Sequence, residues 1–287
     1  MTEPTTARRP MASRMRRGVL LAMRAVVVRL PGRRIPSGVA YRVPVPFQGE
    51  RLDRIIPLRY GPRFEVRDIR DLIQRVIFLN GTWERRESEF VLERLRAGQT
   101  FVDVGANVGY YTLIASHAVG PSGRVLAIEP VAENVGHLKA NLALNGFTNV
   151  DVVPVAATAA EGEARFADRS TTGQTGWGGL DEMGESVVPG RPLDDMLDEL
   201  GIDRVDMLKI DVEGGEPDVL AGATRLLRSD SFVGPILMEF NADRLSVRGA
   251  RPDDLLRLIE SFGFVDRTPI ELKRSELLET RVFEKPQ

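Results

Sequence analysis

The stretch 101-FVDVGANVGYYT-112 joins an apolar run directly to a loop of small residues. Gly105 and Gly109 carry no side chain, so the backbone there can pass close to a ligand, and Asn107 tolerates a left-handed turn. Backbone amides at the start of the following helix would face such a ligand. The stretch therefore predicts a strand, a cofactor-binding loop and a helix, and the question becomes which nucleotide-like cofactor the loop binds.

Two common nucleotide-binding loops do not fit this stretch. The dinucleotide fingerprint G-x-G-x-x-G would need glycine at Asn107 and Tyr110, and the G-K-[ST] of a Walker loop is absent. The pattern present is D-x-G-x-N-x-G, which begins at Asp103. The next apolar run, 124-RVLAIEP-130, ends in Glu129, where an acid can accept hydrogen bonds from both hydroxyls of a ribose. Nicotinamide and S-adenosylmethionine folds share such an acid, and the loop pattern favours S-adenosylmethionine.

From residue 100 onward, short apolar runs alternate with helical patterns. The expected strands cover 100–104, 124–129, 150–156, 205–211 and 233–240, with short ones near 263–267 and 281–285. The expected helices cover 110–118, 132–144, 193–200, 216–228 and 252–262. This alternation predicts an α/β fold with a mostly parallel sheet and helices on both faces. Ligands of such sheets bind beyond the carboxyl ends of the strands, which makes the residues at those ends the candidates for a site.

The length of 287 residues allows one large domain and an accessory segment. We expect a basic N-terminal helix and linker over 1–49, an accessory hairpin and helices over 50–98, and the main domain over 99–287. Within the accessory segment, 55–68 reads as two short strands around a Gly-Pro turn. A helix is expected from Trp83 to Arg96, with Thr82 as its cap.

The first 49 residues hold ten Arg and a single acid, Glu3, which leaves 29 basic and 40 acidic residues in the rest of the chain. An acidic body argues against nucleic acid as a partner. Residues 11–30 have apolar side chains on one helical face and arginines opposite. They are a basic amphipathic helix in peripheral contact with a membrane, an accessory helix packed on the body, or a partly disordered extension. Arg24 and Arg29 interrupt the apolar run, so no membrane span is predicted.

The sequence contains no cysteine. It therefore has no disulfide, no thiolate metal site and no catalytic thiol. This composition fits a reducing compartment, and we expect a cytoplasmic protein that could lie against a membrane through residues 11–30.

Several motifs, in order, resemble the FkbM-type family of S-adenosylmethionine-dependent methyltransferases. They are FVDVGANVGYYT, VLAIEP, NLALNGFTNV, RPLDDMLDEL and LKIDVEGGEPDVLAGA, which together fall within residues 80–241. The segment LKIDVEG-x-E is the most specific of them. The resemblance implies a class I methyltransferase fold, which is Rossmann-like, and methyl transfer to oxygen, typically a hydroxyl of a sugar or polyketide-type metabolite.

The resemblance also assigns residues to the cofactor. The residues that match the family's cofactor loop and ribose acid are Asp103, Gly105, Asn107, Gly109 and Glu129. Asp211, Glu213 and Gly214 match the motif that follows a later strand. Ala156, after the third strand, is expected near the adenine.

A hydroxyl acceptor has to lose its proton during methyl transfer, so it needs a general base or a cation. Asp211 and Glu239 end two strands that would be neighbours in the sheet, and either could be the base. Glu213 is a further catalytic candidate, although it and Glu216 could instead bond backbone amides at a helix start. We expect Lys209 to be ion-paired rather than catalytic, and the two histidines, His117 and His137, to be surface or packing residues.

A metal would use a related set of side chains. Asp211, Glu239 and Asn241 resemble the Mg²⁺ ligands of catechol-type O-methyltransferases, although Glu-x-Asn here replaces adjacent Asp-Asn. The glycine-rich stretch 170-STTGQTGWGGL-180 is either a lid that packs Trp177 on a substrate ring or a surface loop.

These observations favour an S-adenosylmethionine-dependent O-methyltransferase that acts on a small molecule or glycan. The alternatives are a methyltransferase for a protein or lipid-linked acceptor, a nicotinamide-dependent oxidoreductase, and a non-catalytic binding protein.

Overall fold

The computed structural model describes residues 18–19, 21–25, 54–167, 179–180, 184, 186–230, 232, 234–270, 272 and 278–286. The chain divides into two compact units, Met1–Trp83 and Glu84–Gln287. This boundary lies earlier than the expected one at residue 99, because helix α4 (Arg85–Arg94) belongs to the larger unit. Trp177 and most of residues 11–30 lie outside the described residues.

The smaller unit contains the expected hairpin. Strands β1 (Arg54–Pro57) and β2 (Arg63–Val66) pair antiparallel around the Gly-Pro turn. Helix α3 (Leu72–Asn80) follows, and the Asp71 side chain caps it by accepting a 2.8 Å hydrogen bond from the backbone of the third helical residue. Gly81 ends the helix in the left-handed conformation that a residue without a β-carbon adopts most easily.

Arg24 is a described residue of the N-terminal segment. Its guanidinium donates a hydrogen bond to the carbonyl oxygen of Phe78 in α3 and lies 5.3 Å from the centre of the Phe78 ring. Burial lowers the pKa of Arg24. Arg24, one of the arginines expected on the polar face of this segment, is therefore engaged by α3. Of the helices in the described part of the chain, none combines the length and apolar character needed to cross a bilayer.

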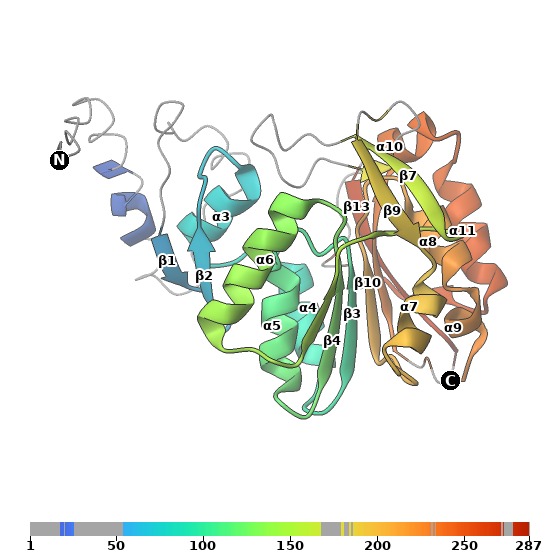
Figure 1. Cartoon of the computed structure of the whole chain (residues 1–287), viewed down its shortest axis with the longest axis horizontal. Helices are drawn as coiled ribbons and strands as arrows, with labels where there is room; N and C mark the ends of the chain where they lie inside the picture. The colour runs from blue at the N-terminus through green and yellow to red at the C-terminus, as the bar shows by residue number, and fades with distance from the viewer. Residues whose placement is uncertain are drawn as a thin grey trace, which may run out of the picture. The chain divides into compact units, whose positions relative to one another are not determined.

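The larger unit is built on a seven-stranded sheet (Figure 1). Its strands, in spatial order, are β12 (Val265–Asp266), β13 (Leu278–Glu284), β11 (Ile236–Asn241), β10 (Met207–Ile210), β3 (Thr100–Val104), β4 (Arg124–Ile128) and β5 (Val150–Val153). The five strands from β11 to β5 are parallel, and β13 runs antiparallel to both of its neighbours. The expected mostly parallel sheet is confirmed.

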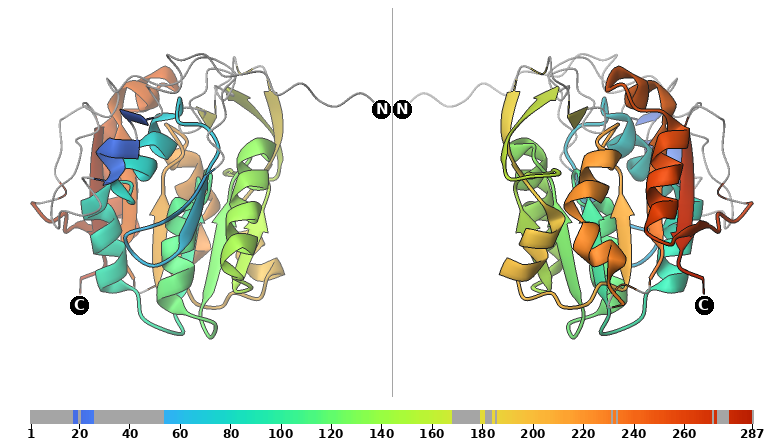
Figure 2. Two further views of the ribbon diagram at one scale, coloured as in Figure 1. Left: turned by 90° about the vertical axis from the view of Figure 1, so that its left-hand side faces the viewer. Right: turned by 90° about the vertical axis from the view of Figure 1, so that its right-hand side faces the viewer.

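Helices cover both faces of this sheet, as Figures 1 and 2 show. On one face lie α4, α5 (Tyr110–Val119) and α6 (Ala132–Asn145). On the other lie α7 (Leu193–Glu199), α8 (Glu216–Gly222), α9 (Thr224–Arg228) and α11 (Pro252–Ser261). A short helix, α10 (Ala242–Val247), follows β11 directly.

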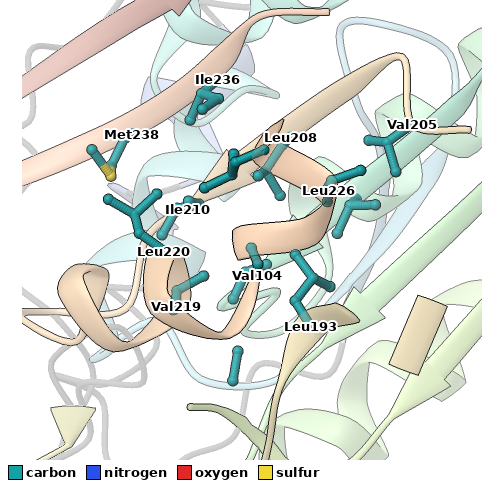
Figure 3. Close-up of a cluster of buried hydrophobic side chains, with 14 of the residues drawn as sticks. Val104, Leu193, Val205, Leu208, Ile210, Val219, Leu220, Leu226, Ile236 and Met238 are labelled. Carbon is teal, nitrogen blue, oxygen red and sulfur yellow. The ribbon is translucent and has the colours of Figure 1, made fainter. Parts of the chain in front are cut away.

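The two faces of the central strands differ in chemistry because side chains alternate along a strand. On the face covered by α7, α8, α9 and α11, the central strands contribute mainly apolar side chains, among them Val104, Leu208, Ile210 and Met238 (Figure 3). These side chains are at most 1% exposed, and burial of this kind contributes about 1.5–3 kcal/mol for each large aliphatic side chain.

The opposite face of the same strands carries charged and polar side chains, and we call it the polar face. Lys209 pairs in register with Asp103 on β3 and with Leu237 on β11. Glu239 on β11 pairs with Thr280 on β13. Partners in register present their side chains on the same face, so the sheet itself gathers these residues.

Three expectations about elements were wrong in detail. The strand expected over 150–156 ends at Val153, and β6 (Ala156–Ala157) instead belongs to a separate four-stranded sheet. The other strands of that sheet are β9 (Ser186–Arg191), β7 (Gly162–Ala167) and β8 (Gly179–Leu180). Helix α4 begins at Arg85 and has Glu84, not Thr82, at its N-cap.

The third difference concerns the helix expected over 216–228, which is broken in two at Ala223. The chain passes very close to another backbone segment here. A β-carbon on Gly222 would lie 2.1 Å from the carbonyl oxygen of Thr158. The helical periodicity of the apolar residues continues across the break, which is why the sequence pattern indicates one helix.

Candidate active site

The loop between β3 and α5 depends on residues with left-handed backbone conformations. Gly105 and Gly109 have φ angles of 82° and 89°, and Asn107 has a φ of 50° as expected from the sequence. A β-carbon on Gly105 would lie 1.8 Å from the carbonyl oxygen of Asp211, and one on Gly109 would lie 2.9 Å from Cγ of Leu138. No other residue type fits at Gly105 without moving the backbone of the loop or of the segment after β10.

Glu129 lies just after β4 and is bound to this loop. Its Oε2 accepts a 2.8 Å hydrogen bond from the backbone amide of Asn107, and its Oε1 accepts bonds from the Val131 amide at 3.0 Å and from Nδ2 of Asn134 at 3.2 Å. Burial raises the pKa of Glu129 to about 7, although the three donors oppose that rise. The carboxyl group therefore lies at the strand end where the sequence predicts a ribose acid.

Asp103 and Ala156 occupy positions beneath the surface of the site. The Asp103 side chain is fully buried and accepts a 2.6 Å hydrogen bond from Oγ1 of Thr112 in α5. Burial raises the pKa of Asp103, and the nearby Lys209 opposes this. Asp103 thus supports the loop from within the protein. Ala156 is 4% exposed, and its backbone pairs with β9 in the small sheet.

A cavity opens at the carboxyl ends of β10 and β11, and we call it the carboxylate cavity. Its lining comprises Glu84, Glu87, Tyr111, Lys209, Ile210, Asp211, Leu237, Glu239 and Thr280. Four of these nine side chains are carboxylic acids, and one is a cation. The polar face of the sheet supplies Lys209, Leu237, Glu239 and Thr280, α4 supplies Glu87, and α5 supplies Tyr111.

Lys209 is the cation of the carboxylate cavity, and it is already engaged. Its Nζ lies 2.8 Å from Oδ2 of Asp211 and 4.8 Å from the centre of the Tyr111 ring. Burial alone would lower the pKa of Lys209, but the carboxylates of Asp211 and Asp103 raise it by more. Lys209 therefore stays protonated, and the predicted ion pair is present.

The structure places the carboxyl groups of Asp211 and Glu239 next to each other. They are within hydrogen-bonding contact, and burial together with the charge of Asp211 raises the pKa of Glu239 well above its usual value. Two adjacent carboxyl groups cannot both ionise easily, so the protonated form of Glu239 is favoured while Asp211 is paired with Lys209. The pair thus offers one hydrogen-bond acceptor and one donor to the cavity.

Glu213 and Glu216 have different surroundings from this pair. Oε2 of Glu213 accepts a 3.2 Å hydrogen bond from Nδ2 of Asn241 and lies 3.5 Å from Nε of Arg244. Burial raises the pKa of Glu213 to about 8 and that of Glu216 to about 7. Oε1 of Glu216 accepts a 3.1 Å bond from the Gly214 amide, which is the helix-start role considered for it.

The three residues proposed as Mg²⁺ ligands do not fit a metal site as they are arranged. Oδ1 of Asn241 accepts the amide of Arg244 at 3.2 Å and caps α10, while its Nδ2 bonds Glu213. The carboxylate of Asp211 is held by Lys209, and Glu239 is held by Asp211. Within the described ranges, no group of three or more histidine, cysteine or acidic side chains is arranged to hold a metal ion.

Several residues of the carboxylate cavity were missed by reasoning from the sequence. Tyr111 lies within the opening stretch, but only the structure shows its hydroxyl donating to Oε2 of Glu84 at 3.1 Å. Thr280 reaches the site because β13 pairs antiparallel with β11, and no local pattern predicts that pairing.

The two histidines lie outside the cavity lining, as expected. His117 is exposed, and its ring lies 6.5 Å from that of Phe147, while His137 is 3% exposed within α6.

Comparison with known proteins gives a consistent family. The Methyltransferase FkbM domain matches residues 103–265. The AMB antimetabolite synthetase AmbE of Pseudomonas aeruginosa is 31% identical over 217 residues, which are 62% of this chain but 10% of that protein. The hexuronic acid methyltransferase AglP of Haloferax volcanii is 26% identical over 202 residues, which are 70% of this chain and 76% of that protein.

Among solved structures, the methyltransferase FkbM of Methylobacillus flagellatus aligns with a TM-score of 0.44 and 18% identity, over 75% of this chain and 54% of that one. The family match spans more than half of the chain, and it covers the glycine loop, Glu129, and the cluster at Asp211 and Glu239. It also agrees with the expected class I fold, whose parallel sheet and helices on both faces are described above. The chain belongs to the FkbM family of S-adenosylmethionine-dependent methyltransferases.

Proposed function

We propose that this protein transfers a methyl group to a hydroxyl of a sugar, glycoside or related small molecule. The observation that carries the proposal is the contact between the two halves of the site. The carbonyl oxygen of Asp211 occupies the space where Gly105 lacks a side chain, so the cofactor loop lies directly against the residue that opens the carboxylate cavity. The relative AglP is named as a hexuronic acid methyltransferase, which supports a sugar-type acceptor.

The residues of the loop fit S-adenosylmethionine. Gly105 and Gly109 allow the left-handed backbone that shapes the loop, and Glu129 supplies a carboxyl group at the end of β4 for a ribose. We assign Gly105, Asn107, Gly109 and Glu129 to cofactor binding, with Asp103 supporting the loop and Ala156 near the adenine. When bound, the cofactor would supply a methyl group on a positively charged sulfur, and the neutral thioether would leave as the methyl carbon bonds to the acceptor oxygen.

Asp211 is the residue to which we assign the acceptor's proton. Its carboxylate lines the cavity and is held by Lys209, whose Nζ lies 2.8 Å away. This carboxylate is therefore the group that can take the proton from the hydroxyl to be methylated. Glu239, whose protonated form is favoured beside Asp211, can donate a hydrogen bond to a second oxygen of the acceptor. Positioning of this kind supplies much of the rate enhancement in an in-line displacement.

Glu213 takes a supporting part in this proposal. Its bonds to Asn241 and Arg244 fix the turn after β10, in which Glu213 itself has a φ of 54°. Strained backbone of this type is common beside functional groups. We therefore place Glu213 as a residue that positions Asp211, two positions earlier in the chain.

The test of the proposal has two parts. Calorimetry should show binding of S-adenosylhomocysteine to the full chain, and incubation with methyl-labelled S-adenosylmethionine and a panel of glycosides should give a labelled methyl ether. Tight NADH binding with no binding of S-adenosylhomocysteine would refute the cofactor assignment. Label recovered only on a carboxyl or amino group would refute the hydroxyl acceptor. Full activity after EDTA treatment is expected, because Asp211 is already paired with Lys209 and Asn241 is bound to Glu213 and Arg244.

A further inference from the structure

The carboxyl group of Glu129 has most of its hydrogen-bonding capacity filled by the protein. A carboxylate can accept about four hydrogen bonds, two on each oxygen. Oε1 accepts the Val131 amide at 3.0 Å and Nδ2 of Asn134 at 3.2 Å, and Oε2 accepts the Asn107 amide at 2.8 Å. Within the part of the chain that the structure describes, Oε2 accepts no second bond. Oε2 is therefore the oxygen that keeps a position for a ligand.

The three donors to this carboxyl group differ in how they depend on the sequence. Val131 and Asn107 donate through backbone amides, which every residue type except proline provides. The third donor is the side chain of Asn134 in α6, so this bond exists only because residue 134 is an asparagine. Substitution at this position can therefore remove one donor and leave the other two in place.

The Asn134 side chain is oriented toward Glu129 at a cost to folding. The residue is 2% exposed, and its Oδ1 has no hydrogen-bond partner among the described residues. Buried polar atoms are normally bonded, and an unpaired one destabilises the folded state. If the amide were turned over, Oδ1 would face the carboxyl group, and two acceptors would meet. The amide thus gives Glu129 a donor and leaves its own oxygen unpaired.

One row of side chains on α6 contacts the cofactor loop and the carboxyl group together. Asn134, Leu138 and Asn141 are spaced as neighbours along a helix surface. A β-carbon on Gly109 would lie 2.9 Å from Cγ of Leu138, and Nδ2 of Asn141 donates to the carbonyl oxygen of Val108 at 3.1 Å. Two members of the row therefore hold the loop, and the third holds the carboxyl group that is bonded to it.

We propose that Asn134 is a positioning residue of the cofactor site, which holds the carboxylate of Glu129 so that Oε2 faces a ribose hydroxyl. This inference rests on the proposed assignment of Glu129 to the cofactor. Asn134 acts through Glu129, because its own side chain is buried and its Nδ2 is bonded to the carboxyl group. A hydrogen bond donated to a carboxylate also favours the charged form, which is the form that accepts a bond from a hydroxyl.

The charge of Glu129 depends on a balance to which Asn134 contributes. Burial raises the pKa of Glu129 to about 7, and the nearby Asp103 carboxyl adds to the rise. The bonds from Val131, Asn107 and Asn134 oppose it. Loss of the Asn134 bond should therefore raise the pKa of Glu129 further, and more of the protein would hold the neutral carboxyl at neutral pH.

Asn134→Leu tests the proposal on the full chain. Leucine is close to asparagine in shape and suits a buried position, but it donates no hydrogen bond. Calorimetry should show the wild type binding S-adenosylhomocysteine more tightly than the variant by about tenfold at pH 6 and about twofold at pH 8. The ratio is compared at each pH, because titration of the ligand affects both proteins equally. A residue with a merely structural role would not make this ratio depend on pH.

Two further variants guard this comparison. Asn134→Ala cannot overpack the helix and should show the same pH-dependent ratio, with the fold of each variant checked by circular dichroism. Asn145→Leu is the matched control, because Asn145 ends the same helix and its Nδ2 donates to the carbonyl oxygen of Asn141 at 2.8 Å. It should leave the ratio close to one from pH 6 to pH 8.

A double-variant cycle shows whether Asn134 acts through Glu129. At pH 7, Asn134→Leu should lower the affinity by about fivefold in the wild-type background. In the Glu129→Ala background there is no carboxyl group to hold, so the same substitution should change the affinity by less than about twofold.

The outcomes separate this inference from the proposed function. If the wild type does not bind S-adenosylhomocysteine, the cofactor assignment fails, and the role of Asn134 fails with it. If the wild type binds and Glu129→Ala binds weakly, but Asn134→Leu binds like the wild type at pH 6, only the role of Asn134 is overturned. An equal loss at every pH, or the full loss in the Glu129→Ala background, also overturns it.

Discussion

A β-carbon on Gly105 would lie 1.8 Å from the carbonyl oxygen of Asp211. The cofactor loop and the segment after β10 can therefore lie this close together only because residue 105 has no side chain. Gly105→Ala should therefore disrupt both. The left-handed conformation alone costs about 1–2 kcal/mol, and the clash adds to it. Since 1.4 kcal/mol corresponds to a factor of ten, we expect calorimetry to show a loss of S-adenosylhomocysteine affinity of about tenfold or more.

Gly136→Ala is the control for that substitution. Gly136 lies within α6, and a β-carbon there would contact nothing within 4 Å. Alanine should raise the free energy of unfolding by about 0.5–1 kcal/mol, because glycine is the poorer helix former. If both variants lost cofactor affinity equally, the close approach at Gly105 would not be the cause.

Cofactor affinity should depend on the ionisation of Glu129. Burial raises the pKa of this carboxyl to about 7, and ribose hydroxyls donate to its charged form. Binding should therefore be tighter at pH 8 than at pH 6. Calorimetry across that range should give a fall in affinity of up to about tenfold per pH unit below the pKa. Glu129→Gln should bind weakly at every pH, and the same pH dependence in that variant would exclude Glu129 as its source.

The free energy of unfolding should fall as the pH rises from about 4.5 to about 8. Burial raises the pKa of Glu213 to about 8 and of Glu216 to about 7, from an ordinary value of 4.5. Between those limits the folded state holds protons that the unfolded chain has released, so stability is highest at the acidic end of this window and lost toward its alkaline end. Urea unfolding should show a smaller difference between pH 5 and pH 8 in Glu213→Gln than in the wild type. The exposed Glu161 provides a control substitution, Glu161→Gln, which should leave the difference unchanged.

The cofactor half of this site could be predicted from the sequence, and the acceptor half could not. Gly105, Asn107 and Gly109 lie within five residues of one another. Their residue types favour left-handed backbone angles, so their spacing predicts the loop. Glu129 follows the next strand of the same sheet. These relationships are local, or involve parallel strands that follow each other in the chain.

The carboxylate cavity depends on longer-range pairing. Thr280 reaches Glu239 only because the last strand turns back antiparallel beside β11, and Glu84 arrives from a helix that precedes the whole sheet. Judged by its residue type, Asn241 is a possible metal ligand. In the structure, however, the chain continues directly into α10, and the Asn241 side chain caps that helix. Residue types alone do not distinguish a ligand from a cap, because the same oxygen serves either purpose.

Lys209 should be essential for stability as well as for the site. Removing it leaves the buried carboxyl group of Asp103 and the partly buried one of Asp211 without their cation, and loss of one partner of a buried pair typically costs about 3–5 kcal/mol. Lys209→Met keeps the apolar stem and removes the charge, so unfolding experiments should show a loss of this size. Arg204→Ala breaks the ion pair with Asp206 on a side chain that is 62% exposed, and it should cost less than about 1 kcal/mol. Equal losses in the two variants would contradict a special role for Lys209.

Asp211→Asn should separate catalysis from cofactor binding. The substitution keeps the shape of the side chain and the backbone carbonyl that contacts the Gly105 loop, but it removes the carboxylate to which the hydroxyl's proton is assigned. General-base catalysis contributes about 10²–10⁴-fold in rate, so labelled methyl transfer should fall by that factor. The affinity for S-adenosylhomocysteine should stay within about threefold, because about 0.6 kcal/mol is the change expected when no direct contact is lost.

Asp218→Asn, on α8 and paired with Arg248 outside the cavity, is the matched control for the change of charge. If Asp211→Asn turned over at the wild-type rate, Glu239 would become the candidate base, and Glu239→Gln should then show the loss instead.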